Sequence, residues 1–65
     1  MNWQEIEGSW EQLKAGMRQQ WSKLTDDEIA AVNGRKEHLV QKLQEKYGLA
    51  HEAAEEEVEK WRAKL

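Results

Sequence analysis

The sequence contains no cysteine and no proline among its 65 residues. Without cysteine the chain has no disulfide bonds and no metal sites built from thiolates. A chain this short buries only about 60% of its unfolded surface, so its hydrophobic core is marginal without additional stabilisation. Disulfides, bound metals and oligomerisation are the usual additions in such small proteins, and the first is excluded here. The length predicts one domain covering residues 1–65.

The sequence also lacks a long apolar run and a strong excess of one charge. Its longest aliphatic run is Ile29–Val32, whereas a helix needs about 20 apolar residues to span a bilayer. Residues 1–5 show neither the basic nor the apolar region of a signal peptide. We therefore expect no membrane segment and a cytoplasmic location. The net charge is −3, with acidic and basic residues interspersed, which is typical of an ordinary soluble surface and not of a polyanion-binding one.

Local capping signals predict where helices begin and end. In a capping box, the side-chain oxygen of a small polar residue accepts from the backbone amide three residues later, and a Glu or Gln at that position reaches back. Asn33-Gly34 and Gly48 tolerate the left-handed conformation with which helices often end. The pairs with capping-box spacing are Asn2 and Glu5, Ser9 and Gln12, and Thr25 and Glu28.

The spacing of apolar residues predicts helices between these signals. From Trp3 to Leu24 the apolar residues recur at steps of three or four, which is one face of a helix. One helix of that length would span the whole domain, whose radius of gyration should be about 11 Å, so we expect a break at Gly8-Ser9. The predicted elements are a short N-terminal helical turn and helices over about 10–22, 26–32, 35–46 and 51–64.

These elements predict an all-α fold, because no window alternates apolar and polar residues as a strand does. The short connections favour four short helices, plus the N-terminal turn, arranged as two packed helical hairpins. The predicted core consists of Trp10, Leu13, Met17, Trp21, Leu24, Ile29, Val32, Leu39, Val40, Leu43, Tyr47, Val58 and Trp61.

The chain offers few residues for catalysis or metal binding. Its hydroxyl groups fall at helix ends or, for Tyr47, on a predicted core stripe, and a nucleophilic site needs a hydroxyl beside an oriented base. His51 and Glu55 are four residues apart and share a helix face, but zinc sites take three or four ligands. We therefore expect no enzyme, cofactor or metal. An enzyme or metal-binding protein that uses His51 and Glu55 is the third alternative.

The helix predicted over 35–46 is basic. Four cationic residues against Glu37 and Glu45 leave it at +2. Basic groups at a helix N-terminus bind phosphate in many proteins, although the sequence pI near 5.3 argues against a nucleic-acid footprint. Nucleic-acid binding is thus an alternative to a solvated basic face. The residues concerned are Arg35, Lys36, Lys42 and Lys46.

The N-terminal turn carries the predicted exposed contact. Aromatic anchors are enriched at interfaces, and the chain has four tryptophans. Three of them lie on predicted core stripes, whereas Trp3 belongs to the N-terminal turn, which need not reach the core. Trp3 and Ile6 are therefore the candidate contact with a partner or with a second copy of the chain.

Several stretches, each weak alone, occur in an order and spacing that is typical of one family. The densest is Leu39–Gly48, with the pattern LV-x-KLQEKYG. The others are Asn2-Trp3, Ile6–Gly8, Trp10–Lys14, Gln20–Asp27, Gly34, Ala54-Glu55, Val58 and Trp61. In these stretches the sequence resembles the CsbD-like family of small bacterial stress-response proteins. Relatives usually have glycine where this chain has Ala15 and Gln41, and both replacements raise helix propensity.

The resemblance implies a bacterial, cytosolic, all-helical protein that is induced in general stress and folds as two orthogonally packed helical hairpins. It supplies no catalytic or ligand-binding residues. The leading hypothesis is a non-enzymatic stress-response protein that acts through its abundance or by binding another macromolecule. An unknown protein partner or self-association fits this hypothesis. The alternative is a nucleic-acid-binding module that uses the basic helix.

Overall fold

The chain forms five helices and no strand in the computed structural model, which describes residues 1–65. The predicted all-α fold is confirmed, and the predicted N-terminal turn is the first helix. No helix has both the length and the hydropathy needed to cross a membrane. The helices are α1 (Trp3–Gly8), α2 (Trp10–Gln20), α3 (Asp26–Val32), α4 (Lys36–Tyr47) and α5 (His51–Lys64).

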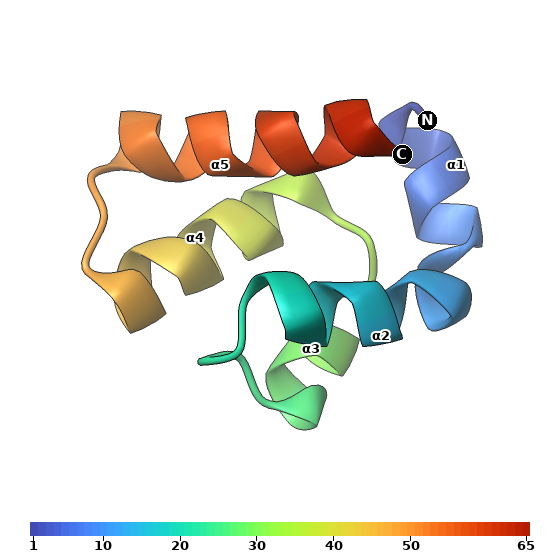
Figure 1. Ribbon diagram of the computed structural model, residues 1–65, viewed down its shortest axis with the longest axis horizontal. Helices are drawn as coiled ribbons and strands as arrows, with labels where there is room; N and C mark the ends of the chain where they lie inside the picture. The colour runs from blue at the N-terminus through green and yellow to red at the C-terminus, as the bar shows by residue number, and fades with distance from the viewer.

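The helices pack as two pairs that meet through α3 and α4. Helix α4 packs along α5, α2 packs against α3, and α3 also contacts α4 (Figure 1). Helix α1 turns away from α2 at one end of the molecule and brings the two chain termini together there (Figure 1). Arg62 Nη1 donates a hydrogen bond of 3.2 Å to the Met1 carbonyl oxygen. The radius of gyration, 10.6 Å, matches the value expected for a compact chain of this length.

Two of the three predicted capping boxes are formed. The Glu5 amide donates to Asn2 Oδ1 at 2.8 Å, and the Glu28 amide donates to Thr25 Oγ1 at 3.1 Å. In both boxes the glutamate accepts in return from the backbone amide of its partner, at 3.0 Å. The third prediction is wrong in its detail, because the Ser9 side chain makes no capping hydrogen bond, although the helix does break at this residue.

The core agrees with the prediction except at four positions. Leu13 and Tyr47 are only partly buried. The Tyr47 hydroxyl accepts a 3.2 Å hydrogen bond from the Lys23 amide, which explains why this end of the ring stays at the surface. Ile6 and Ala54 are fully buried and were missing from the predicted core.

Helix α2 ends at Gln20, two residues earlier than predicted.

The turn between α3 and α4 holds α1 in place. Asn33 and Gly34 have positive φ values of 52° and 77°, as predicted for a helix stop. A Cβ atom on Gly34 would lie 2.5 Å from Glu7 Cα, so the two backbones are in direct contact. Only glycine allows this approach. Helix α1 therefore lies between this turn and the C-terminal end of α5, where Trp61 and Arg62 contact Trp3 and Met1.

Candidate functional site

All four tryptophans form one cluster around Trp61. The Trp61 ring centroid lies 5.7 Å from Trp21, 6.3 Å from Trp3 and 6.4 Å from Trp10. Trp10 meets Trp61 edge to face, with 83° between the ring planes, which is a favoured aromatic geometry. Trp10 Nε1 donates a 2.9 Å hydrogen bond to the Ile29 carbonyl, whereas Trp3 Nε1 is buried without a partner.

This cluster corrects the prediction for the N-terminal turn. Ile6 is 0% exposed and belongs to the core, so it is not an exposed contact. Trp3 is half-buried against the core and beside Trp61. The turn reaches the core because the C-terminal end of α5 folds back beside it, at a separation of about sixty residues along the chain. Sequence periodicity contains no signal for such a contact.

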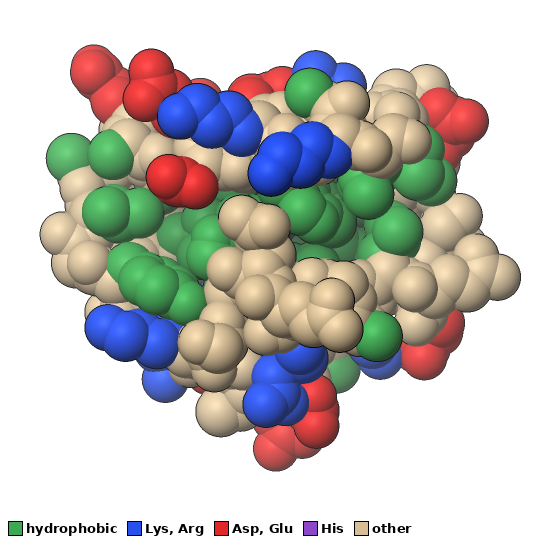
Figure 2. All heavy atoms as spheres, in the orientation of Figure 1, with side chains coloured by type: hydrophobic (Ala, Val, Ile, Leu, Met, Phe, Trp, Pro, Cys, Tyr) green, Lys and Arg blue, Asp and Glu red, His purple; other side chains and the backbone are tan.

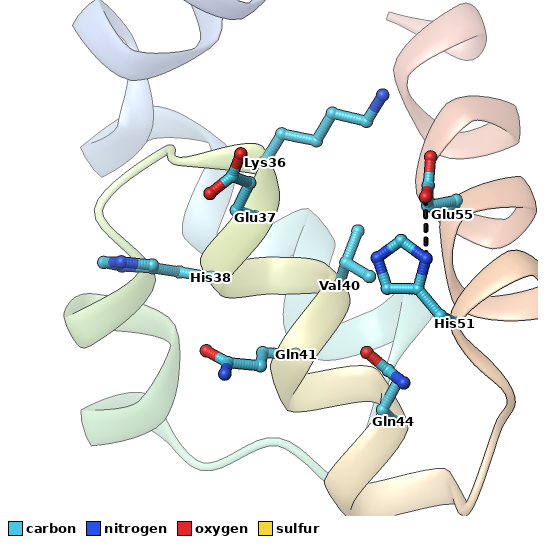
Figure 3. Close-up of a pocket in the computed structure, with 8 residues that line it drawn as sticks. All are labelled: Lys36, Glu37, His38, Val40, Gln41, Gln44, His51 and Glu55. Atoms are coloured by element: carbon cyan, nitrogen blue, oxygen red, sulfur yellow. Dashed lines mark ion pairs between the residues drawn. The ribbon is translucent and has the colours of Figure 1, made fainter.

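The predicted basic residues are mostly bound to carboxylates. Lys36 Nζ lies 3.0 Å from Glu59 Oε1 on α5, and Figure 3 shows this lysine directed toward that helix. Lys46 Nζ lies 3.0 Å from Glu28 Oε2 on α3. These pairs tie α4 to both of its neighbours.

Two of the predicted basic residues, Lys42 on α4 and its N-cap residue Arg35, have no carboxylate partner on another helix. Lys42 Nζ is 3.6 Å from Glu45 Oε2 on the same helix. Arg35 is exposed and forms no ion pair. Because Lys42 and Lys46 are one helical turn apart, they share a face of α4. The structure thus brings together part of the predicted surface and turns Lys36 toward α5.

Two carboxyl groups have shifted pKa values because of these contacts. The hydrogen bond from Arg62, followed by the one from Lys36, lowers the pKa of Glu59 to about 2. The backbone amide of Thr25 and then the Lys46 ammonium lower the pKa of Glu28. Both carboxylates are therefore charged at neutral pH and act as structural anchors between helices.

A polar groove of about 530 Å³ lies between α4 and α5 (Figure 3). His51 Nδ1 lies 2.9 Å from Glu55 Oε1 at its edge, while His38 points away from this pair. No three His, Asp or Glu side chains come together as a metal-binding group, so the structure adds no third ligand to His51 and Glu55. The groove is lined by Lys36, Glu37, His38, Val40, Gln41, Gln44, His51 and Glu55.

Apolar side chains are also visible on the surface. Figure 2 shows them in a band across one face between α5 and α2, with charged side chains along both edges. Leu65 is the exposed large apolar residue, at 40%. Partly buried apolar side chains pack against the core, and these are Met1, Trp3, Leu13, Tyr47 and Leu49.

Together these features define a small all-helical domain with a tryptophan-centred core and ion pairs between its helices. A sequence model of the CsbD-like family matches residues 4–56. The chain belongs to the CsbD-like family.

Its relatives are bacterial proteins of similar length. The UPF0337 protein YjbJ of Salmonella typhimurium is 46% identical over 61 residues, which cover 94% of this chain and 87% of that protein. A UPF0337 protein of Pectobacterium atrosepticum is 44% identical over 94% of this chain and 88% of its own length. A UPF0337 protein of Rhodopseudomonas palustris is 41% identical over 94% of this chain and 92% of its own length.

Proposed function

We propose that the chain is a non-enzymatic, cytoplasmic stress-response protein that acts by binding another macromolecule. The stress-response part rests on the resemblance to the CsbD-like family. The observation that carries the non-enzymatic part is that the side chains capable of catalysis have structural roles. Thr25 caps α3, the Tyr47 hydroxyl accepts from a backbone amide, and Glu59 joins α5 to α4.

The apolar band between α5 and α2 supports a protein partner. Isolated exposed apolar residues are normal, whereas apolar side chains gathered on one face, as in Figure 2, are typical of interaction surfaces. Charged side chains along both edges would then give the contact its orientation.

Nucleic-acid binding through α4 is the second candidate. Arg35 is free of ion pairs, and it lies at the N-terminal end of α4, where backbone amides favour an anion. The ion pairs of Lys36 and Lys46 count against this candidate, because a phosphate would have to compete with Glu59 and Glu28.

An amide NMR titration with duplex DNA at low and moderate salt distinguishes the two candidates. For the protein-binding role we expect no DNA-induced shifts in α4. Shifts from Arg35 to Lys46 that disappear as salt rises would instead support nucleic-acid binding, because phosphate contacts weaken steeply with salt.

Matched variants make the titration specific. Replacing Lys42 and Lys46 by glutamine removes two positive charges from α4. The control variant replaces Lys60 and Lys64 by glutamine, which removes two positive charges from α5. Weaker DNA binding in the first variant alone would assign binding to α4, whereas equal weakening in both would indicate a non-specific charge effect.

The stress-response role is tested by the amount of the protein in cells. We expect its level to rise under salt, heat, ethanol or stationary-phase stress. A constant level under all four conditions would contradict the proposal.

A further inference from the structure

The apolar stripe of α2 continues through α1 without a change of phase. Its members recur at steps of three or four residues on both sides of Ser9. A stripe with this spacing is one face of a single straight helix. In the structure the helix bends at Ser9, and the bend lets Trp3 and Trp10 both pack against Trp61 (Figure 1). The stripe consists of Trp3, Ile6, Trp10, Leu13, Met17 and Trp21.

The bend is confined to one residue. Ser9 has φ −108° and ψ 16°, whereas a helical residue has φ near about −63° and ψ near about −42°. The Ser9 amide already donates to the Glu5 carbonyl at 3.0 Å, and the Leu13 amide donates to the Ser9 carbonyl at 3.2 Å. Both are four-residue bonds of an α-helix, and they are shared with three-residue bonds from the Ser9 amide to the Ile6 carbonyl (3.2 Å) and from the Gln12 amide to the Ser9 carbonyl (3.0 Å). Since the Ser9 side chain makes no capping hydrogen bond, straightening the helix loses no cap.

The surface that receives α1 consists of Gly34, Trp61 and Arg62, and we call it the α1-binding surface. Gly34 meets the Glu7 backbone, Trp61 packs beside Trp3, and Arg62 donates to the Met1 carbonyl. The fit is incomplete, because Trp3 Nε1 is buried there without a hydrogen-bond partner.

A straight helix over residues 3–20 cannot keep α1 on its own α1-binding surface. Eighteen residues make a helix of about 27 Å, and its first six residues would extend about 9 Å beyond the start of α2. The molecule measures 28 × 22 × 17 Å, so the straight helix would be about as long as the whole molecule. The released α1 would expose Ile6 and leave the α1-binding surface of the same chain open.

We infer that the chain exchanges α1 with a second copy of itself, with Ser9 as the hinge. A second copy is the occupant because its α1-binding surface is identical and offers α1 the same contacts at Gly34, Trp61 and Arg62. Reciprocal exchange gives a two-fold symmetric dimer in which the contacts of α1 are the same as in the monomer. The inference is independent of the proposed function and concerns the assembly state.

Two double variants of the same composition test the hinge. Gly8→Ala with Ser9→Ala favours a helical backbone at the bend, while Gly16→Ala with Ser22→Ala makes the same changes away from it. A Cβ atom on Gly8 or Gly16 meets nothing within 4 Å, so both variants keep the packing. We expect the dimer association constant of the hinge variant to rise about fivefold, because Ser9 becomes helical in both chains of the dimer and alanine favours that conformation, whereas Gly8 is helical in the monomer already.

Light scattering coupled to size-exclusion chromatography over a range of concentrations gives the association constants. An association constant that is unchanged in the hinge variant, or raised equally in the control, overturns the inference. Ser9→Ala alone should give a similar rise in the association constant, which covers loss of folding in the double variant.

Isotope-filtered NMR then distinguishes exchange from ordinary dimerisation. Labelled and unlabelled hinge-variant chains are unfolded, mixed and refolded together. Exchange of α1 predicts cross-peaks between Trp3 of one chain and Trp61 of the other, since these rings are neighbours within the monomer. A dimer whose Trp3–Trp61 cross-peaks arise only within single chains overturns the inference.

Discussion

Replacing Gly34 by alanine tests whether the contact between Gly34 and Glu7 holds α1 in place. The added methyl group would lie 2.5 Å from Glu7 Cα and 3.1 Å from the Glu7 backbone nitrogen. Backbone atoms cannot move aside as a flexible side chain can, so α1 must shift as a unit. The φ value of +77° adds a second cost, because an L-residue with a side chain is strained there.

The magnitude follows from these two costs. The left-handed backbone costs alanine about 1–2 kcal/mol. Displacing α1 removes part of the burial of Ile6, whose full burial contributes about 1.5–3 kcal/mol. We therefore expect the free energy of unfolding to fall by about 2–4 kcal/mol, out of a total of about 3–10 kcal/mol for a chain of this length. For so small a domain the midpoint of thermal unfolding should fall by about 10 °C or more.

Gly48→Ala is the matched control. Gly48 also has a positive φ, 64°, but a Cβ atom there meets nothing within 4 Å. Its substitution carries the backbone cost alone. Urea and thermal unfolding, followed by circular dichroism, give both free energies. Equal destabilisation by the two substitutions would refute the reasoning, because it would show that the contact with Glu7 contributes nothing.

Two further predictions concern buried and charged contacts. Trp10→Phe should lower the free energy of unfolding by about 2–4 kcal/mol, because it removes buried volume and leaves the Ile29 carbonyl with only the 3.5 Å hydrogen bond from the Asn33 amide. Trp3→Phe should cost less in the same urea titration, because Trp3 Nε1 has no partner to lose, and an equal cost would contradict this account. The pKa of Glu59 in the folded state, about 2, lies below its ordinary value of 4.5, so its contribution to stability is present above about pH 4.5 and lost as the pH falls toward 2. Because this side chain is 40% exposed, the contribution should be at most about 1 kcal/mol, and the difference in stability between the wild type and Glu59→Gln should shrink as the pH falls from about 4.5 to 2. A difference that is constant from pH 7 to pH 2 would contradict the assignment.

The sequence by itself determined where the helices lie and which faces of α2 to α5 are buried. Capping boxes act over three residues, and a left-handed glycine ends a helix locally, so Thr25, Glu28 and Gly48 could be interpreted without knowing what surrounds them. Apolar periodicity is equally local. It identified the core stripes, although Tyr47 is only partly buried because its hydroxyl contacts the Lys23 amide.

Only the tertiary structure decided the environment of α1 and of the basic residues. Ile6 is buried because α1 lies against parts of the chain that are distant in sequence, and the helical pattern of α1 cannot specify those neighbours. From the sequence, Lys36 and Lys46 belong to a solvent-exposed basic face. In the structure they form ion pairs with Glu59 on α5 and Glu28 on α3. Helix formation depends on neighbours along the chain, whereas burial and charge pairing depend on which surfaces meet in space.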